Sequence, residues 1–226
     1  EWERYAWIKA RVITGGKAGA ELMEMARPFV FRRYVDYSAF AAMREMKAMI
    51  EREVMRRNIE DDIKLGAGGI REIEFIVQVF QLIYGGSKRE LQDRQCLVNL
   101  HHLGEAELLD QQAVIDLEDA YLFLRRVEHA IQALNDQQTQ SLPNEPELRQ
   151  RMIETLGFAD WQAFLDVLNQ KRDKVKVQFK QLIQEQEFSA PIDDFSQLEQ
   201  RLNTVLDEDA KNLIQNFWHG QALRKI

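Results

Sequence analysis

One short stretch, residues 64–78, holds the residue types that could do chemistry. Its three closely spaced glycines free the backbone for conformations that other residues avoid. The helix predicted after them would present unpaired amide groups and the positive end of its dipole, which attract anions. With cations on either side, this helix start could bind a phosphate or a nucleotide. The candidate phosphate-binding residues are Lys64, Gly66, Gly68, Gly69 and Arg71.

Two carboxylates follow in the same stretch, at Glu72 and Glu74. Beside a phosphate they could steer a magnesium ion or orient Arg71, so these three side chains are the catalytic candidates, and no metal ligand is assigned. Acids near a helix start also commonly complement the helix dipole on a solvated face. The glycines have a structural explanation too, a tight turn with close helix packing. The stretch matches neither a P-loop nor a dinucleotide fingerprint, so the residue pattern alone favours the structural explanation.

The histidines and the cysteine are weaker candidates for catalysis or metal binding. His101 and His102 are adjacent, so on a helix they would point about 100° apart and could not chelate together. His129, beside Glu128, is typical of the polar edge of a long helix. The single cysteine, Cys96, excludes an intrachain disulfide and any zinc spacing.

The elements that must position these residues are helices. Apolar residues recur at spacings of three and four, which predicts an all-α, multi-helix bundle. Gly85 and Gly157 should each end a helix, whereas Ser38 and Asp160 should each begin one. Helices are expected over residues 38–57, 70–84, 111–135, 147–156 and 161 to about 183. The third and the last of these should pack antiparallel.

The chain divides into three predicted parts. Residues 1–88 would flank the candidate site, residues 89–188 would form a helical bundle, and residues 189–226 would hold a linker and the start of a further helical unit. The linker is predicted around residues 188–194, where a proline and two aspartates occur.

Charge and hydropathy narrow the function classes. Residues 1–90 carry 16 Lys and Arg against 14 Asp and Glu, and residues 91–226 carry 14 against 23. A near-neutral amino-terminal part and an acidic carboxy-terminal part argue against nucleic-acid binding, which needs a basic face.

We find no membrane-spanning apolar run and no leader, so we expect a cytoplasmic protein. A start on Glu1 within an amphipathic stretch is typical of an excised piece.

Over residues 64–78 the chain closely resembles the glutamine synthetase adenylyltransferases, in the part that follows their nucleotidyltransferase core. The resemblance covers about residues 1 to 190. Further segments match in the same order: Trp2–Tyr5, Lys9–Arg11, Arg27–Tyr34, Phe123–Glu128 and Gln138–Pro143. The uridylyltransferase that acts on the signalling protein PII is a cousin that diverges after Glu74.

The resemblance implies a two-module enzyme that controls glutamine synthetase by reversible adenylylation. One module removes AMP by phosphorolysis to give ADP, and the other attaches AMP from ATP. Arg71 and Glu72 indicate the removing module, since the attaching one tends to have a small apolar residue and Asp there. By the same resemblance Lys64 and Arg71 would neutralise phosphate oxygens, and the implied partners are glutamine synthetase and PII.

The family also has a Gly-Ser pair and an Asp-x-Asp pair on strands of an α/β core, where the aspartates hold Mg²⁺. Those pairs are missing here, because neither Gly86-Ser87 nor Asp207–Asp209 has the required context. The bundle would therefore follow a missing core, and the chain alone should be inactive. Two alternatives stay open: the homologous attaching module, or a non-catalytic helical module that docks glutamine synthetase or PII.

Overall fold

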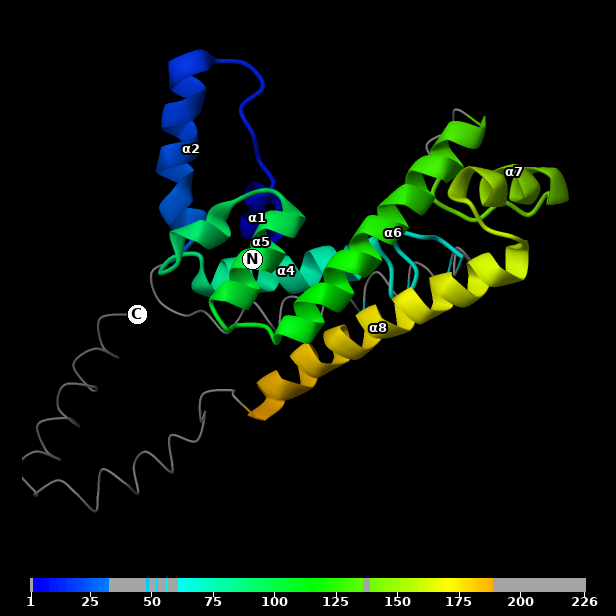
Figure 1. The fold of residues 1–226 in the computed structure, drawn as a ribbon. Helices are drawn as coiled ribbons and strands as arrows, with labels where there is room; N and C mark the ends of the chain where they lie inside the picture. Colours follow the sequence, from blue (N-terminus) through cyan, green and yellow to red (C-terminus); the bar gives the residue numbers. More distant parts are fainter. Residues whose placement is uncertain are drawn as a thin grey trace, which may run out of the picture. The chain divides into compact units, whose positions relative to one another are not determined.

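The computed structural model describes residues 2–32, 61–135 and 139–188, together with Ala48, Arg52 and Arg56. Within these ranges the backbone is helical, and the only β pairing is a single bridge between Asp62 and Ser141. The expected all-α class is confirmed (Figure 1). The elements are α1 (Trp2–Ile8), α2 (Gly16–Val30), α4 (Ile70–Tyr84), the 3-10 helix η1 (Arg89–Gln92), α5 (Cys96–Glu105), α6 (Gln111–Asn135), α7 (Pro146–Leu156) and α8 (Trp161–Phe188).

The predicted bounds of the central helices are confirmed. Helices α4 and α6 span the predicted ranges, and α7 begins one residue early because proline is well suited to a first helical position. The predicted end of α8 near residue 183 is wrong. The helix continues through a Gln-Glu-Gln-Glu run of good helix formers, so Phe188 is helical and not part of a linker. The helix predicted for residues 38–57 lies outside the described residues, except for three helical positions.

Helices α2, α5 and η1 were not predicted. Helix α2 contains Gly19 and Pro28, which are poor helix formers and interrupt its pattern, and Val30 is its one buried residue. Helix α5 is short, and η1 has only four residues. Short elements are fixed by what they pack against, and a sequence pattern reveals little of this.

Helix α4 is the centre of the core, because α1, α5, α6 and η1 all pack on it. Its apolar residues are buried on nearly every side. The fully buried Arg4 of α1 holds neighbouring elements together. Its guanidinium donates to the Val30 carbonyl at the end of α2 (Nε 3.2 Å, Nη2 3.1 Å) and to the Leu82 carbonyl of α4 (Nη2, 3.4 Å).

Helices α6 and α8 run antiparallel, as predicted (Figure 1). Lys174 of α8 donates to Asp116 of α6 at 2.7 Å, and Lys171, one turn earlier on α8, pairs with Asp119, one turn later on α6. Asp160 caps α8, with its carboxylate accepting the Ala163 amide at 2.8 Å. Gly157 ends α7 in the left-handed conformation, as expected of a terminal glycine.

The described residues up to Gln186 belong to one compact unit. Inside this unit, η1 and α5 pack on α4, so elements on both sides of position 88 share one core. In the described part of the chain, no helix is both long enough and apolar enough to cross a bilayer.

The buried amide of Gln81 should contribute strongly to stability. Its Nε2 donates to the carbonyls of Leu91 (2.6 Å) and Asp93 (2.7 Å), which fixes η1 and the following loop on α4. Gln81→Leu would leave both acceptors without this donor and should lower the free energy of unfolding by about 2–4 kcal/mol. Urea denaturation measures this.

The matched control is Gln150→Leu on α7, where an exposed amide bonds Glu154 at 2.7 Å. That change should stay within about 0.5 kcal/mol of the parent. Equal effects of the two substitutions would contradict the role assigned to Gln81.

Candidate functional site

The candidate stretch opens with a tight turn that Asp62 organises. The Asp62 side chain accepts the amides of Lys64 (2.8 Å) and Leu65 (2.7 Å), and its carbonyl accepts the Gly66 amide at 3.0 Å. Side chains of Asp and Asn commonly close turns in this way, by bonding the backbone two or three residues on. The chain thus turns once and enters α4 at Ile70.

Two of the glycines are required by geometry. Gly68 has φ +72°, and a Cβ there would lie 2.4 Å from the carbonyl oxygen of Arg172 in α8. At Gly69 a Cβ would meet three backbone carbonyl oxygens at 2.7 Å. The structural explanation of these glycines, a tight turn with close helix packing, therefore holds in this structure.

The amides at the start of α4 are not unpaired, contrary to our expectation. Ile70 donates to the Ile63 carbonyl (3.2 Å), Arg71 to Lys64 (3.0 Å) and Glu72 to Gly69 (3.1 Å). The turn folds back over the helix end, so its own carbonyls take the positions that an anion would occupy. Phosphate binding in this stretch stays a prediction, and it now depends on cationic side chains.

Glu72 and Glu74 have different surroundings although they are two residues apart. Glu72 is buried, and its Oε2 accepts the amide of Gly68 at 3.1 Å. Burial lowers the pKa of Arg172, and the negative charge of Glu72 is among those that oppose this effect. In this structure Glu72 stabilises the turn and does not contact Arg71 through any described hydrogen bond.

Two segments that are distant in sequence, residues 140–141 and α8, form hydrogen bonds that hold the turn in place. The Ile63 amide donates to the Gln140 carbonyl at 2.8 Å, and Asp62 forms the β bridge with Ser141. Arg172, buried in α8, donates from Nη2 to the Asp62 carbonyl at 2.7 Å. Sequence reasoning missed Arg172, although a charged residue at an inward position of the α8 apolar stripe was an available signal.

Glu74 is the centre of one group of charges. Its carboxylate pairs with Lys9 at the end of α1 (3.1 Å) and with Arg71 one turn away (3.7 Å). The Arg71 guanidinium also lies over the rings of Phe75 (5.1 Å) and Tyr5 (5.8 Å). The predicted contact between Glu74 and Arg71 is present, and Arg71 is held in place from two sides.

Glu128 of α6 is the centre of a second group. Its side chain is 3% exposed and pairs with Arg125 at 2.6 Å and with Lys64 at 4.0 Å. Each carboxylate thus has two cations around it. We refer to these two groups together as the charge cluster, which consists of Lys9, Lys64, Arg71, Glu74, Arg125 and Glu128.

Tyr121 and Cys96 connect the two groups. Burial, together with Cys96, Glu74 and Glu128, raises the pKa of Tyr121 to about 12, against an opposing effect of Arg125. Burial likewise raises the pKa of the Cys96 thiol to about 12, with Lys9, Glu74 and Arg125 near enough to act on it. The charges of α1, α4 and α6 therefore act on one shared region beside α5.

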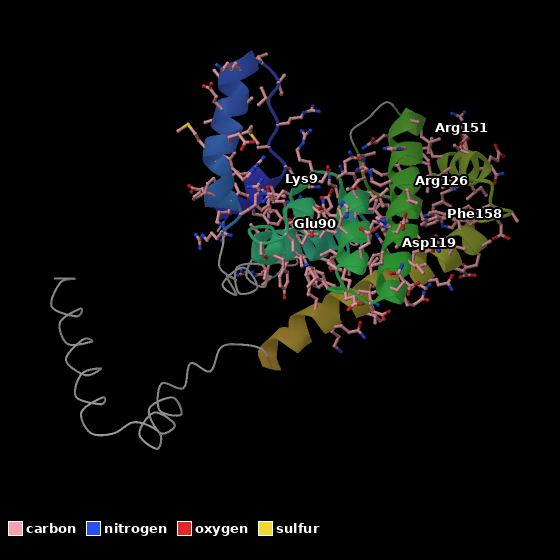
Figure 2. The ribbon with its side chains drawn as sticks, turned by 60° about the vertical axis from the view of Figure 1, so that its left-hand side comes forward. Lys9, Glu90, Asp119, Arg126, Arg151 and Phe158 are labelled. Atoms are coloured by element: carbon pink, nitrogen blue, oxygen red, sulfur yellow. The ribbon has the colours of Figure 1, made fainter. Side chains whose placement is uncertain are left out.

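The charge cluster has four cations and two carboxylates, so it favours an anion. All four cations remain partly exposed, from 30% for Arg71 to 39% for Lys9, and a ligand could reach them. Figure 2 labels Lys9 beside α1. Sequence reasoning missed Lys9 and Arg125, because nothing in the local pattern brings α1 and α6 against α4.

The three histidines that the structure describes have no contact with the charge cluster among the described ion pairs. His101 and His102 both contact Glu105 on α5, at 3.3 and 3.1 Å, and His129 is exposed on α6. Across the described ranges, no three His, Cys, Asp or Glu side chains gather as metal ligands would. The carboxylates of the charge cluster are already neutralised by cations, which makes them unsuited to Mg²⁺.

Known families and proteins match this chain closely. The family described as GlnD PII-uridylyltransferase matches residues 44–183. A protein of Acinetobacter baylyi is 73% identical over 226 residues, all of this chain and 24% of that protein. A protein of Chromobacterium violaceum is 55% identical over 182 residues, which are 80% of this chain and 20% of that protein. A protein of Pseudomonas putida is 52% identical over 184 residues, which are 81% of this chain and 19% of that protein.

All three relatives are named bifunctional glutamine synthetase adenylyltransferase/adenylyl-removing enzyme. They confirm the resemblance that residues 64–78 and the other matching segments indicate. The chain spans about a fifth to a quarter of the length of these relatives.

The contact of Gly68 with α8 gives a test of the turn. Gly68→Ala adds a left-handed backbone cost and a clash with the Arg172 carbonyl, so unfolding free energy should fall by about 2–5 kcal/mol. Gly157→Ala is the control, since Gly157 also has positive φ but open space around it. That control should cost only about 1–2 kcal/mol. If the two variants unfold at the same urea concentration, the close approach to α8 is absent.

Cys96 should be nearly inert in the folded chain, because it is 7% exposed and its pKa is about 12. The thiolate is the reactive form, so alkylation by iodoacetamide at pH 8 should be slow in buffer and fast in urea. A Ser87→Cys, Cys96→Ala chain supplies an exposed thiol for comparison. Equal rates for the two chains in buffer would show that Cys96 is accessible.

Proposed function

The chain belongs to the family described as GlnD PII-uridylyltransferase, and from this premise we propose that it is part of a nucleotidyltransferase acting on glutamine synthetase. The names of the three relatives support this target. Within that enzyme we assign the chain to the module that removes AMP. Support comes from the Arg71-Glu72 pair, since the attaching module tends to have a small apolar residue and Asp at these positions.

The reaction proposed for the whole enzyme is phosphorolysis. An oxygen of inorganic phosphate attacks the phosphorus of the AMP–tyrosine phosphodiester, and the bond from phosphorus to the tyrosine oxygen breaks. The products are ADP and a tyrosine hydroxyl, which takes up the proton. Negative charge is concentrated on phosphate oxygens throughout, so cations held in place beforehand stabilise the transition state.

The charge cluster is the observation that carries this proposal. Lys64 and Arg71 would neutralise phosphate oxygens, and Lys9 and Arg125, which pair with the same two carboxylates, would join them. Glu74 and Glu128 would hold these four cations in position. Arg71 is the best placed to form a fork with a phosphate, because its ring contacts and Glu74 fix its guanidinium.

Magnesium would be held elsewhere in the longer protein. Ionised carboxylates are its usual protein ligands, but Glu72 is bonded to the Gly68 amide, and Glu74 and Glu128 are paired with cations. The metal, when bound, would neutralise charge on the nucleotide phosphates. This segment would supply side-chain cations on the same phosphate oxygens, with ADP, ATP and inorganic phosphate as the substrates of the complete enzyme.

Docking of glutamine synthetase against this chain and binding of PII stay predictions. No described surface favours one of these partners over the other. A purely non-catalytic docking module would need cations only to neutralise Glu74 and Glu128, whereas the charge cluster has two more cations than carboxylates.

Arg71→Gln in the complete enzyme should test the removing role. Phosphate-dependent release of ADP from adenylylated glutamine synthetase should fall about 10- to 100-fold, the range expected when a charge-assisted hydrogen bond of ~1.5–3 kcal/mol is lost. Arg71→Lys keeps the charge but loses the fork, so it should restore only part of the activity.

The matched control is Arg151→Gln on α7, which is exposed and lies well apart from Lys9 (Figure 2). It should leave ADP release unchanged. AMP attachment from ATP is measured in parallel and should survive Arg71→Gln. Loss of attachment with removal intact would move this chain to the attaching module, and full activity of both reactions would reject the role of Arg71.

A further inference from the structure

A second concave site lies between α1, α2 and the loop after η1. The cavity has a volume of about 640 Å³, within the range of small-molecule sites. It shares no described lining residue with the charge cluster. Its walls combine apolar and cationic side chains, among them Trp7, Arg11, Met23, Arg27, Phe31 and Arg94.

The walls of this cavity are held in place by the core. Arg4 bonds the Val30 carbonyl, which anchors the end of α2, and the ring of Phe31 packs closely over Gly85. The loop before α5 is fixed by the buried amides of Gln81 and Asn99, which both donate to the Asp93 carbonyl at 2.7 Å. The site is therefore formed before any ligand arrives, which lowers the cost of binding.

The charges of this cavity favour an anion. Three arginines line it against one acid, Asp93, whose Oδ1 already accepts the Gln95 amide at 2.7 Å. Arg27 is engaged with Glu24 at 2.7 Å. Among the residues that the structure describes, Arg11 and Arg94 form no ion pair, so both guanidinium groups are available as planar forks for a carboxylate or phosphate.

The apolar walls add a second requirement. Trp7 and Phe31 are partly buried and present ring surface to the cavity, with Met23 from α2 beside them. Aromatic side chains pack favourably with flat rings, and arginine stacks on such rings as well. Inorganic phosphate would use the cations and leave this surface uncovered.

We propose that this cavity binds a small organic anion with a flat ring, whose charged group is held by Arg11 and Arg94 while the ring lies against Trp7. The anionic group can be a phosphate or a carboxylate, since both match the arginine fork. The site goes beyond the proposed reaction, because none of the charge-cluster residues lines the cavity.

Calorimetric titration of the chain tests this proposal. The probes are AMP, 2-naphthoate and inorganic phosphate. AMP or 2-naphthoate should bind saturably, and the tighter of the two identifies the anionic group that the site prefers. The double variant Arg11→Ala, Arg94→Ala should weaken that binding about tenfold or more, whereas Arg89→Ala, an exposed arginine of η1 outside the cavity, should not. Ligand-induced quenching of tryptophan fluorescence should disappear in Trp7→Phe.

Three results would overturn the proposal: no binding of either ring-bearing probe, binding that the double variant leaves unchanged, or phosphate that binds as tightly as both ring-bearing probes. Titration of the Arg71→Gln variant with AMP distinguishes binding in this cavity from binding at the charge cluster. AMP binding that depends on Arg71 and not on Arg11 and Arg94 belongs to the charge cluster, which would reject the cavity and leave the proposed function standing.

Discussion

The close contact between Gly68 and Arg172 determines where α4 begins and what surrounds it. The backbone of the glycine turn lies directly against the backbone of α8, at a distance that only glycine permits. From the same position the Arg172 side chain reaches the Asp62 carbonyl, and Ile63 bonds the segment that follows α6. Three parts of the chain, far apart in sequence, are thereby fixed around the first turn of α4.

This arrangement requires a buried arginine, which is unfavourable in itself. Burial lowers the pKa of Arg172, whereas Asp61, Asp62 and Glu72 oppose that effect. A guanidinium in the interior needs such neighbours, because removing it from water costs several kcal/mol. The acids beside Arg172 therefore have a structural role, and Glu72, which also caps the turn, serves that role and not the charge cluster.

Helix geometry explains why Glu74 differs from Glu72. Residues two apart on a helix face different directions, whereas residues three apart are neighbours. Arg71 and Glu74 therefore share one edge of α4, where Lys9 joins them, and Glu72 points towards α8. The same spacing on α6 pairs Arg125 with Glu128. Two local pairs become one region only because α4 and α6 pack together.

The sequence by itself determined the helices and the position of the candidate stretch. Periodic apolar residues marked α4 and α6 correctly, because this signal is local and repeats over several turns, and Gly85 marked the end of α4. The resemblance of residues 64–78 pointed to the right family for the same reason, since it depends on the order of residues alone. Helix α2 was not predicted, because Gly19 and Pro28 interrupt its pattern.

Only the tertiary structure decided what the candidate residues contact. It closed the amides of α4 with the carbonyls of the turn, turned Glu72 towards Gly68, and brought Lys9 to Glu74 and Lys64 to Glu128. These partners lie up to 65 residues apart in sequence. Ion pairs and close backbone contacts act over a few ångströms, so they depend on how helices pack, and a pattern along one helix does not contain that information.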